Sequence, residues 1–284
     1  MTRDVWLAKH PYLQQVADVQ GLIDAAVMEI PMPAACVPSW DDYTSDFHAG
    51  IPLLRSPRVA IDFRDLERAL TSLVQALALK PLPERLVQDS RTLEAQLSGD
   101  LDSPRRALEW LLDRNPFISP SPGLLRYLGW TVLARFLHPV VEAFGGWRDE
   151  ERWLRPYCPT CGAVAAMAQL VGIDPGRIRF LSCGSCRSRW RYRRTGCPFC
   201  KSEDDHRLAV LAVEGEGGLR IDYCEDCGGY LKTYNGQGSE SVLLADWTSL
   251  HFDVIAADRG LKRLAWSLYT LPNQELVRQG RPGL

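Results

Sequence analysis

Eight of the nine cysteines of the chain stand in pairs whose members are separated by two residues. Thiolates bind zinc and iron strongly, and the Cys-x-x-Cys spacing lets one tight turn direct two sulfur atoms at one ion. A tetrahedral site needs four sulfurs, so four pairs make two sites. The predicted metal ligands are Cys158, Cys161, Cys183, Cys186, Cys197, Cys200, Cys224 and Cys227.

The intervals between the pairs favour one of two ways of combining them. Long intervals of 21 and 23 residues flank a short one of 10 residues, which is typical of a module that is repeated once. Sequential pairing then joins the first two pairs at one site and the last two pairs at the other. Interleaved pairing, as in cross-braced fingers, stays open as the alternative. Disulfides are not favoured, because a chain of this length has ample core and a bridge within one pair is strained.

The remaining candidates for chemistry do not form a constellation. Cys36 has no partner pair and is interpreted as a buried or inert thiol, and His138 is interpreted as a packed or capped histidine. His206 and His251 lie near the predicted metal modules, but four sulfurs already complete each shell. A closed shell has no open position for water or substrate. The sequence also lacks a phosphate loop, a nucleophile elbow and a His-Glu-x-x-His helix, so it argues against an enzyme.

Short strands are expected to position the cysteine pairs. Alternating apolar residues precede and follow the second pair, and a glycine-rich turn at 214–218 is typical of a hairpin. Gly162 and Gly228 directly follow the second cysteine of a pair, where a tight turn tolerates a positive φ. The predicted strands are 177–181, 189–193, 208–213 and 219–223.

The chain before the cysteine pairs is predicted to be helical, since apolar residues recur there at spacings of three and four. Ser103-Pro104 and Ser121-Pro122 are typical helix starts, Pro139 predicts a kink, and Gly145-Gly146 predicts a helix end. The proline-rich stretch 31–57 is predicted to be irregular. Predicted helices cover 1–30, 62–80, 84–97, 103–112 and 124–144, and an amphipathic helix follows the last pair at 243–261. The tail 271–284 shows no periodicity.

The overall composition is that of an ordinary soluble protein, with 46% hydrophobic and 24% charged residues and a net charge of −2. No apolar run reaches the roughly 18 residues that span a bilayer, and the N-terminus lacks the apolar core of a secretory signal. A reducing compartment also keeps thiols available for metal. We therefore expect a cytoplasmic protein with no membrane insertion.

Basic residues concentrate in the first predicted metal module. Such a patch is typical of a surface that binds nucleic acid or an acidic protein, or of a solvated strand face. The second module is acidic instead, which disfavours a nucleic-acid-binding zinc-ribbon protein. The arginines are Arg177, Arg179, Arg187, Arg189, Arg191, Arg193 and Arg194.

The segments around the cysteines also allow a comparison with a known family. They read Cys158-Pro-Thr-Cys-Gly162, Phe180-Leu-Ser-Cys-Gly-Ser-Cys-Arg-Ser-Arg-Trp190, Gly196-Cys-Pro-Phe-Cys200 and Tyr223-Cys-Glu-Asp-Cys-Gly-Gly-Tyr-Leu-Lys-Thr233. In this order they resemble the FdhE-type formate dehydrogenase accessory proteins. Weaker similarities to that family are His10-Pro11, Tyr12-Leu13, Gln20, Gly50-Ile-Pro-Leu53, Ala245-Asp246 and Ser249-Leu250.

The fold class expected from these observations is multi-domain. An all-α N-terminal domain (1–147) precedes two small β metal modules of the rubredoxin-like or zinc-ribbon type, at 156–195 and at 196–284, the latter with the C-terminal helix. The resemblance implies the rubredoxin-like character and two iron ions, each held by four cysteines. Zinc is the alternative metal, because four thiolates suit both.

The resemblance also implies a function. It points to a cytoplasmic accessory protein that assists the maturation and assembly of molybdenum- or tungsten-containing formate dehydrogenases and is not itself an enzyme. The implied partner is the formate dehydrogenase catalytic subunit, bound through the Cys-x-x-Cys region, and nucleic acid is not expected as a partner. An iron-dependent redox or sulfur-handling protein is the alternative from another class.

Overall fold

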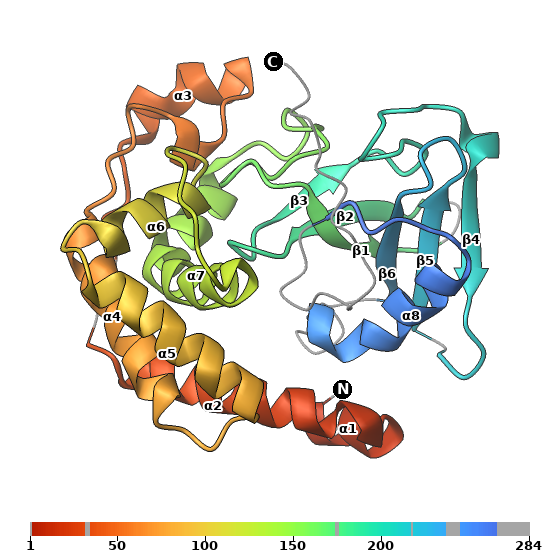
Figure 1. The fold of residues 1–284 in the computed structure, drawn as a ribbon. Coiled ribbons are helices and arrows are strands. Elements are labelled where there is room, and N and C mark those ends of the chain that lie inside the picture. The colour runs from red at the N-terminus through yellow and green to blue at the C-terminus, as the bar shows by residue number, and fades with distance from the viewer. Residues whose placement is uncertain (1, 32–34, 174–175, 217, 237–244, 266–284) are drawn as a thin grey trace.

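A computed structural model of the chain describes residues 2–31, 35–173, 176–216, 218–236 and 245–265 (Figure 1). In these ranges, helices fill the first half of the chain and a mixed β-sheet fills the second, followed by a further helix. The predicted fold class is thus confirmed. The helices of the first half are α1 (Arg3–Lys9), α2 (Gln14–Glu29), α3 (Trp40–Ala49), α4 (Phe63–Ala78), α5 (Glu84–Ser98), α6 (Ser103–Leu111) and α7 (Pro122–Trp147).

Helix α4 forms the centre of the helical part. Its buried residues include Leu66, Leu70, Leu73 and Leu77, which recur every three or four positions and so form one apolar stripe. This stripe packs against α5, α6 and α7. The carboxylate of Asp62 caps the helix by accepting a hydrogen bond from the backbone nitrogen of Arg64. The helix expected at 62–80 is therefore present.

Helix α7 differs from its prediction at both ends. It starts at Pro122 and continues through Gly145-Gly146 to Trp147, so the predicted glycine stop is wrong. Phe144 and Trp147 stack with ring centroids 6.0 Å apart, and this packing holds the last turn in place. Pro139 lies inside the continuous helix. Among the described helices, none combines the length and the apolar character needed to cross a membrane.

The stretch 31–57 is not wholly irregular as predicted, because it contains α3. Tyr43 and Phe47, four residues apart, are the buried residues of this otherwise polar helix. Two buried positions are too few to produce a clear helical period. Asp41 and Asp42 in its first turn complement the helix dipole, and Gly50 ends it with a φ of 80°.

The strands that the structure describes in the second half form one six-stranded sheet in the order β3-β2-β1-β6-β5-β4. Each half of this sheet is an antiparallel three-stranded unit, and the two units join where β1 and β6 pair in parallel. The strand order therefore shows a three-stranded unit that occurs twice, which is the repeated module that the cysteine intervals predicted. The strands are β1 (Ala165–Val171), β2 (Ile178–Cys183), β3 (Arg189–Tyr192), β4 (Leu208–Ala212), β5 (Leu219–Cys224) and β6 (Tyr230–Asn235).

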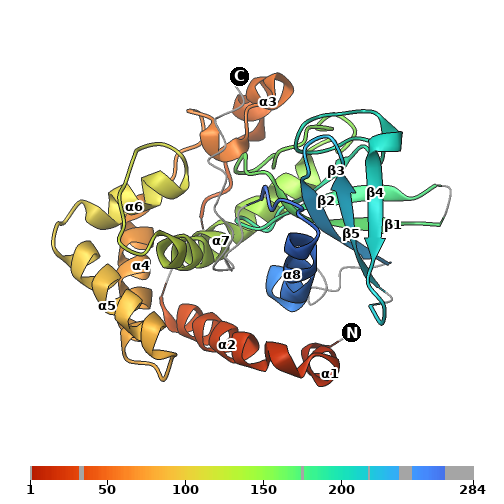
Figure 2. The same cartoon turned by 45° about the vertical axis from the view of Figure 1, so that its right-hand side comes forward.

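The N-terminal helices and the C-terminal helix lie together on the second half of the sheet. Figures 1 and 2 show α8 (Leu250–Asp258) between the sheet and α1. Trp6 packs in one apolar cluster with Phe252 and the sheet residue Ile221, and its indole nitrogen donates to the carbonyl oxygen of Thr248 at 3.0 Å. The N-terminal segment thereby contacts residues that lie more than 200 positions later in the chain.

Two helix predictions need correction here. The helix expected over 1–30 is divided into α1, the 3-10 turn Pro11–Leu13 and α2, because the nitrogen of Pro11 cannot donate a hydrogen bond. The helix expected over 243–261 is α8, preceded by the 3-10 turn Asp246–Ser249. Part of that range and the predicted tail 271–284 lie outside the described residues.

Candidate metal centres

All four Cys-x-x-Cys pairs lie on turns of the same backbone geometry. The nitrogen of the first cysteine donates to the carbonyl oxygen five residues later, at 2.9 Å in Cys183–Ser188 and in Cys197–Ser202. The residue after the second cysteine always has a positive φ. These residues are Gly162 (81°), Arg187 (64°), Lys201 (65°) and Gly228 (68°). The sequence indicated this conformation only at the two glycines.

The turns bring the sulfur atoms together in sequential order. The first cluster consists of Cys158, Cys161, Cys183 and Cys186, and the second of Cys197, Cys200, Cys224 and Cys227. Within each cluster all ligand atoms lie within 4.8 Å of one another. Of the two pairings that the sequence left open, the structure has the sequential one.

The distances between sulfurs fit a tetrahedral metal site. In the second cluster the Sγ atoms of Cys197 and Cys227, and those of Cys200 and Cys224, are each 3.8 Å apart. Four sulfurs at about 2.3 Å from one zinc ion are about 3.8 Å from each other. The corresponding distances in the first cluster are 3.4 and 3.5 Å. A disulfide would need about 2.05 Å, so the sulfurs do not form bridges, and each cluster could hold a metal ion.

The first cluster is enclosed by the helical part of the chain. All four of its cysteines are buried in the same apolar cluster as α4 and α7. The backbone nitrogens of Leu53 and Leu54 donate to the carbonyl oxygens of Pro159 and Thr160 at 2.9 and 2.8 Å. The Gly50-Ile-Pro-Leu53 segment thus holds the first turn against the helices.

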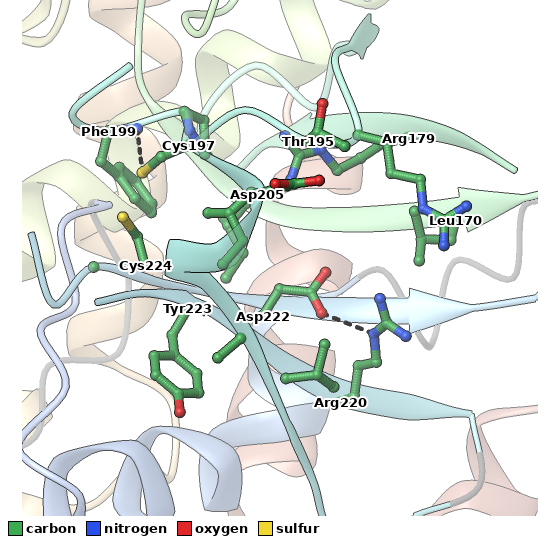
Figure 3. Close-up of a pocket in the computed structure, with 17 residues that line it drawn as sticks. Leu170, Arg179, Thr195, Cys197, Phe199, Asp205, Arg220, Asp222, Tyr223 and Cys224 are labelled. Carbon is green, nitrogen blue, oxygen red and sulfur yellow. Dashed lines mark hydrogen bonds and ion pairs between the residues drawn. The ribbon is translucent and has the colours of Figure 1, made fainter. Parts of the chain in front are cut away.

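The second cluster lies at the surface and borders a cavity. Cys200 is exposed and Cys227 is partly exposed. The other two cysteines, Cys197 and Cys224, are buried and line a cavity with a volume of about 260 Å³. Figure 3 shows Cys197, Phe199 and Cys224 at one end of it, with Arg179 and Arg220 at the other.

Most of the cavity lining is apolar, but charged side chains line one part of it. The Nε atom of Arg220 lies 2.8 Å from Oδ1 of Asp222, and Thr233 donates to the other carboxylate oxygen at 2.9 Å. Asp205 lies between this pair and the cysteines in Figure 3. The site therefore combines an aromatic ring, charged side chains of both signs and thiols in one cavity.

Two thiols of the second cluster, those of Cys197 and Cys227, hold their protons in the absence of a cation. Burial raises the pKa of Cys227 to about 11 and raises the pKa of Cys197 still further. A thiol must lose its proton to bind a metal, so metal binding at this cluster releases protons and weakens as the pH falls.

The predicted basic patch is largely used inside the chain. Arg179 is buried and donates to backbone carbonyl oxygens of Arg193 and Gly196. Arg191 and Arg193 form ion pairs with Glu151 and Glu203. These internal partners leave less charge for a nucleic acid or an acidic protein surface.

The isolated residues do not join the cysteine clusters. Cys36 is exposed. His138 is 69% exposed beside Glu142, so its interpretation as a packed residue is wrong, because it lies on the outer face of α7. His206 is exposed, whereas His251 contacts Glu216 and not the cysteines.

A buried ionic network behind β6 was missed by sequence reasoning. The ammonium group of Lys232 is fully buried, 2.5 Å from Asp246 and 2.8 Å from Asp253. Arg263 binds both aspartates, and Tyr230 donates to Asp253 at 2.7 Å. Tyr230 and Lys232 belong to the Tyr-Leu-Lys segment that the sequence analysis had singled out. Their ionic partners Asp246, Asp253 and Arg263 follow later in the chain, and no sequence pattern joins them to this segment.

Curated proteins similar to this chain are named FdhE homologues. The chain is 31% identical over 178 residues to the one from Stutzerimonas stutzeri, covering 60% of this chain and 56% of the relative. It is 34% identical over 131 residues to that of Pseudomonas aeruginosa, covering 43% and 41%, and 28% identical over 145 residues to that of Aquifex aeolicus, covering 49% and 50%. The matches thus span about half the length of these relatives. No family model matches the chain.

A solved structure has the same fold over almost the whole chain. The crystal structure of the FdhE protein from Pseudomonas aeruginosa aligns with a TM-score of 0.55 at 22% identity, covering 96% of this chain and 98% of that one. The resemblance indicated by the order of the cysteine pairs is thus confirmed: the chain is similar in sequence to FdhE homologues over about half of their length, and it has the fold of the FdhE protein from Pseudomonas aeruginosa.

Proposed function

We propose that this protein is a cytoplasmic accessory protein in the maturation of formate dehydrogenase, and that it binds the catalytic subunit of that enzyme. The proposal rests on its similarity to FdhE proteins and on the presence of two four-cysteine clusters. In this function the chain positions and protects a partner and does not catalyse a reaction.

The observation that carries the proposal is the difference between the two clusters. The first is buried against the helices, where it can only stabilise the fold. The second presents Cys200 and the half-buried ring of Phe199 at the surface, beside a cavity that both apolar and charged side chains line. Aromatic side chains next to polar groups are typical of interface centres. We therefore assign partner binding to the face around the second cluster.

Iron or zinc fits the donor set of both clusters. A bound ion fixes the geometry of the two turns that it joins. The chain itself supplies the contacts around it. Phe199 and Pro198 line the apolar end of the cavity, and Asp205, Arg220 and Asp222 line the polar end. A partner segment would need an apolar group and hydrogen-bonding groups at matching positions.

The test is a binding titration with the purified formate dehydrogenase catalytic subunit. Phe199→Ala should weaken binding about ten-fold or more if this ring is an interface centre. Phe117→Ala is the matched control, since Phe117 is a half-buried phenylalanine of the helical part. Both variants must keep the metal content of the unaltered protein.

Two results would contradict the assignment. Equal weakening by both variants would indicate a general loss of stability, and unchanged binding in Phe199→Ala would move the interface to another face. A second comparison uses iron-loaded, zinc-loaded and metal-free protein. Equal affinity of all three would show that the cysteine turns take no part in binding.

A further inference from the structure

Three residues with metal-binding side chains meet where the N-terminal segment contacts the second half of the sheet. His10 follows α1, Glu216 lies in the turn between β4 and β5, and His251 lies in the first turn of α8. The Nε2 atom of His10 is 2.6 Å from Oε1 of Glu216, and that of His251 is 3.0 Å from the same oxygen. None of the three belongs to a cysteine cluster.

The hydrogen bonds of His10 show that a proton or a metal ion has to lie between its Nε2 atom and the carboxylate of Glu216. Its Nδ1 atom is 3.0 Å from the carbonyl oxygen of Trp6, which can only accept, so Nδ1 carries a proton. The Nε2 atom of a neutral ring then has a lone pair that points at a carboxylate oxygen. Two acceptors at 2.6 Å repel unless a proton or a metal ion lies between them.

The structure assigns a third metal site to His10, Glu216 and His251, for a divalent transition-metal cation such as zinc. Two imidazole nitrogens and one carboxylate oxygen are a common donor set for such ions. All three ligand atoms lie within 4.8 Å of one another. Ligands at about 2.1 Å from zinc are roughly 3.4 Å apart, so only small side-chain shifts are needed.

The surroundings favour a metal ligand role for His10. Its ring stacks on Trp6 with centroids 4.0 Å apart, and the hydrogen bond from Nδ1 to a backbone carbonyl fixes the tautomer and the direction of Nε2. Hydrogen bonds of this kind orient most metal-binding histidines. The three side chains remain between 8% and 17% exposed, so an ion can enter and a water molecule can complete the shell.

The site differs in chemistry from the cysteine clusters, and the experiment uses this difference. Both cysteine clusters are first filled with zinc, and cobalt(II) is then added as the probe ion. The protein should bind one cobalt ion in addition to two zinc ions. Its visible band should be weak, without the intense sulfur-to-cobalt charge transfer of a thiolate site.

Two variants and one control decide the assignment. Glu216→Gln and His251→Ala should each reduce cobalt affinity at least ten-fold, while His206→Ala, which removes an exposed histidine of the same module, should not. All three must retain two zinc ions. Should His251→Ala lose zinc, the nearly isosteric Glu216→Gln decides alone. The assignment is overturned by the absence of a third ion in the unaltered protein, or by undiminished cobalt binding in Glu216→Gln.

Discussion

The residue that follows each Cys-x-x-Cys pair sets the direction of the turn. Its left-handed backbone lets the chain reverse directly after the second sulfur, and glycine adopts this conformation without strain. Glycine occupies two of the four positions, whereas Arg187 and Lys201 adopt it with a side chain present. These two positions therefore contain strain that the metal-bound turn has to offset.

Substitutions at these positions should differ in effect. Gly228→Ala should cost about 1 kcal/mol, because a Cβ atom there meets nothing nearer than 3.8 Å and only the backbone is strained. Gly162→Ala should cost more, since its Cβ would also lie 3.1 Å from Cγ of Pro52, which is buried and cannot move aside as the guanidinium of Arg55 can. Lys201→Gly should be neutral or stabilising. Urea unfolding of the zinc-loaded variants measures all three, and a larger loss in Gly228→Ala than in Gly162→Ala would contradict this explanation.

The buried ammonium group of Lys232 gives a second prediction at this scale. In Lys232→Met, Asp253 and Asp246 lose the ammonium group and keep their ion pairs with Arg263. Removing one partner of a buried ionic network costs about 3–5 kcal/mol. The double variant Lys232→Met with Asp253→Asn should be more stable than the sum of the single effects predicts. Additive effects in this double-mutant cycle would show that the two groups do not interact.

At the scale of elements, the sequence predicted the helices and strands in which the apolar residues recur with the same period as the buried positions. Helix α4 carries an unbroken apolar stripe, and β5 alternates. Strands β1 and β6 were missed for a common reason: they pair with each other in the middle of the sheet and are buried along almost their whole length. The alanines of β1 and the polar residues of β6 give no alternation. Their burial is decided by the junction of the two units, which no local pattern encodes.

The start of α4 should depend on pH. Hydrogen bonds from the side chain and the backbone of Arg64 lower the pKa of Asp62 to about 2. A carboxyl group with a lowered pKa stabilises the fold above its unfolded value and loses this effect as the pH falls through the folded value. Asp62→Ala should therefore be less stable than the unaltered protein at pH 7.

The difference between the two proteins should shrink between about pH 4 and pH 2. Denaturant unfolding at a series of pH values measures it. The two proteins contain the same cysteine sites. The effect of acid on these sites therefore cancels when the two unfolding free energies are subtracted at each pH. A difference that stays constant down to pH 2 would rule out the carboxylate as its cause.

At the scale of the whole molecule, the two metal centres differ in what they hold together. The spacing of the cysteines predicted the metal ligands and favoured their sequential pairing, but their unequal burial depends on contacts with Leu53 and Leu54, which are remote in sequence. The first cluster belongs to the same apolar core as α4 and α7. Loss of metal from this cluster should therefore destabilise these helices. The second cluster has fewer such contacts.

Single cysteine substitutions test this difference. A structural zinc site contributes on the order of 10–16 kcal/mol, comparable with the stability of a domain. Cys183→Ser should release one metal ion and increase amide hydrogen exchange in α4 and α7 as well as in β1 and β2. Cys227→Ser should release one ion but leave exchange in α4 at its original rate. Equal exchange in α4 for both variants would show that the helices fold independently of the first cluster.

The contact between Trp6 and Thr248 bridges 242 positions of the chain, and it fixes an order of events during synthesis. A ribosome adds about 5–20 residues per second, so α1 waits for its partner on the order of tens of seconds. During this time the apolar side chains of Trp6 and Leu7 have no native surface to cover them. Although α1 is made before the sheet, it is thus among the last helices to dock, after the cysteine turns have emerged. A nascent chain that stops before α8 would present this helix to chaperones.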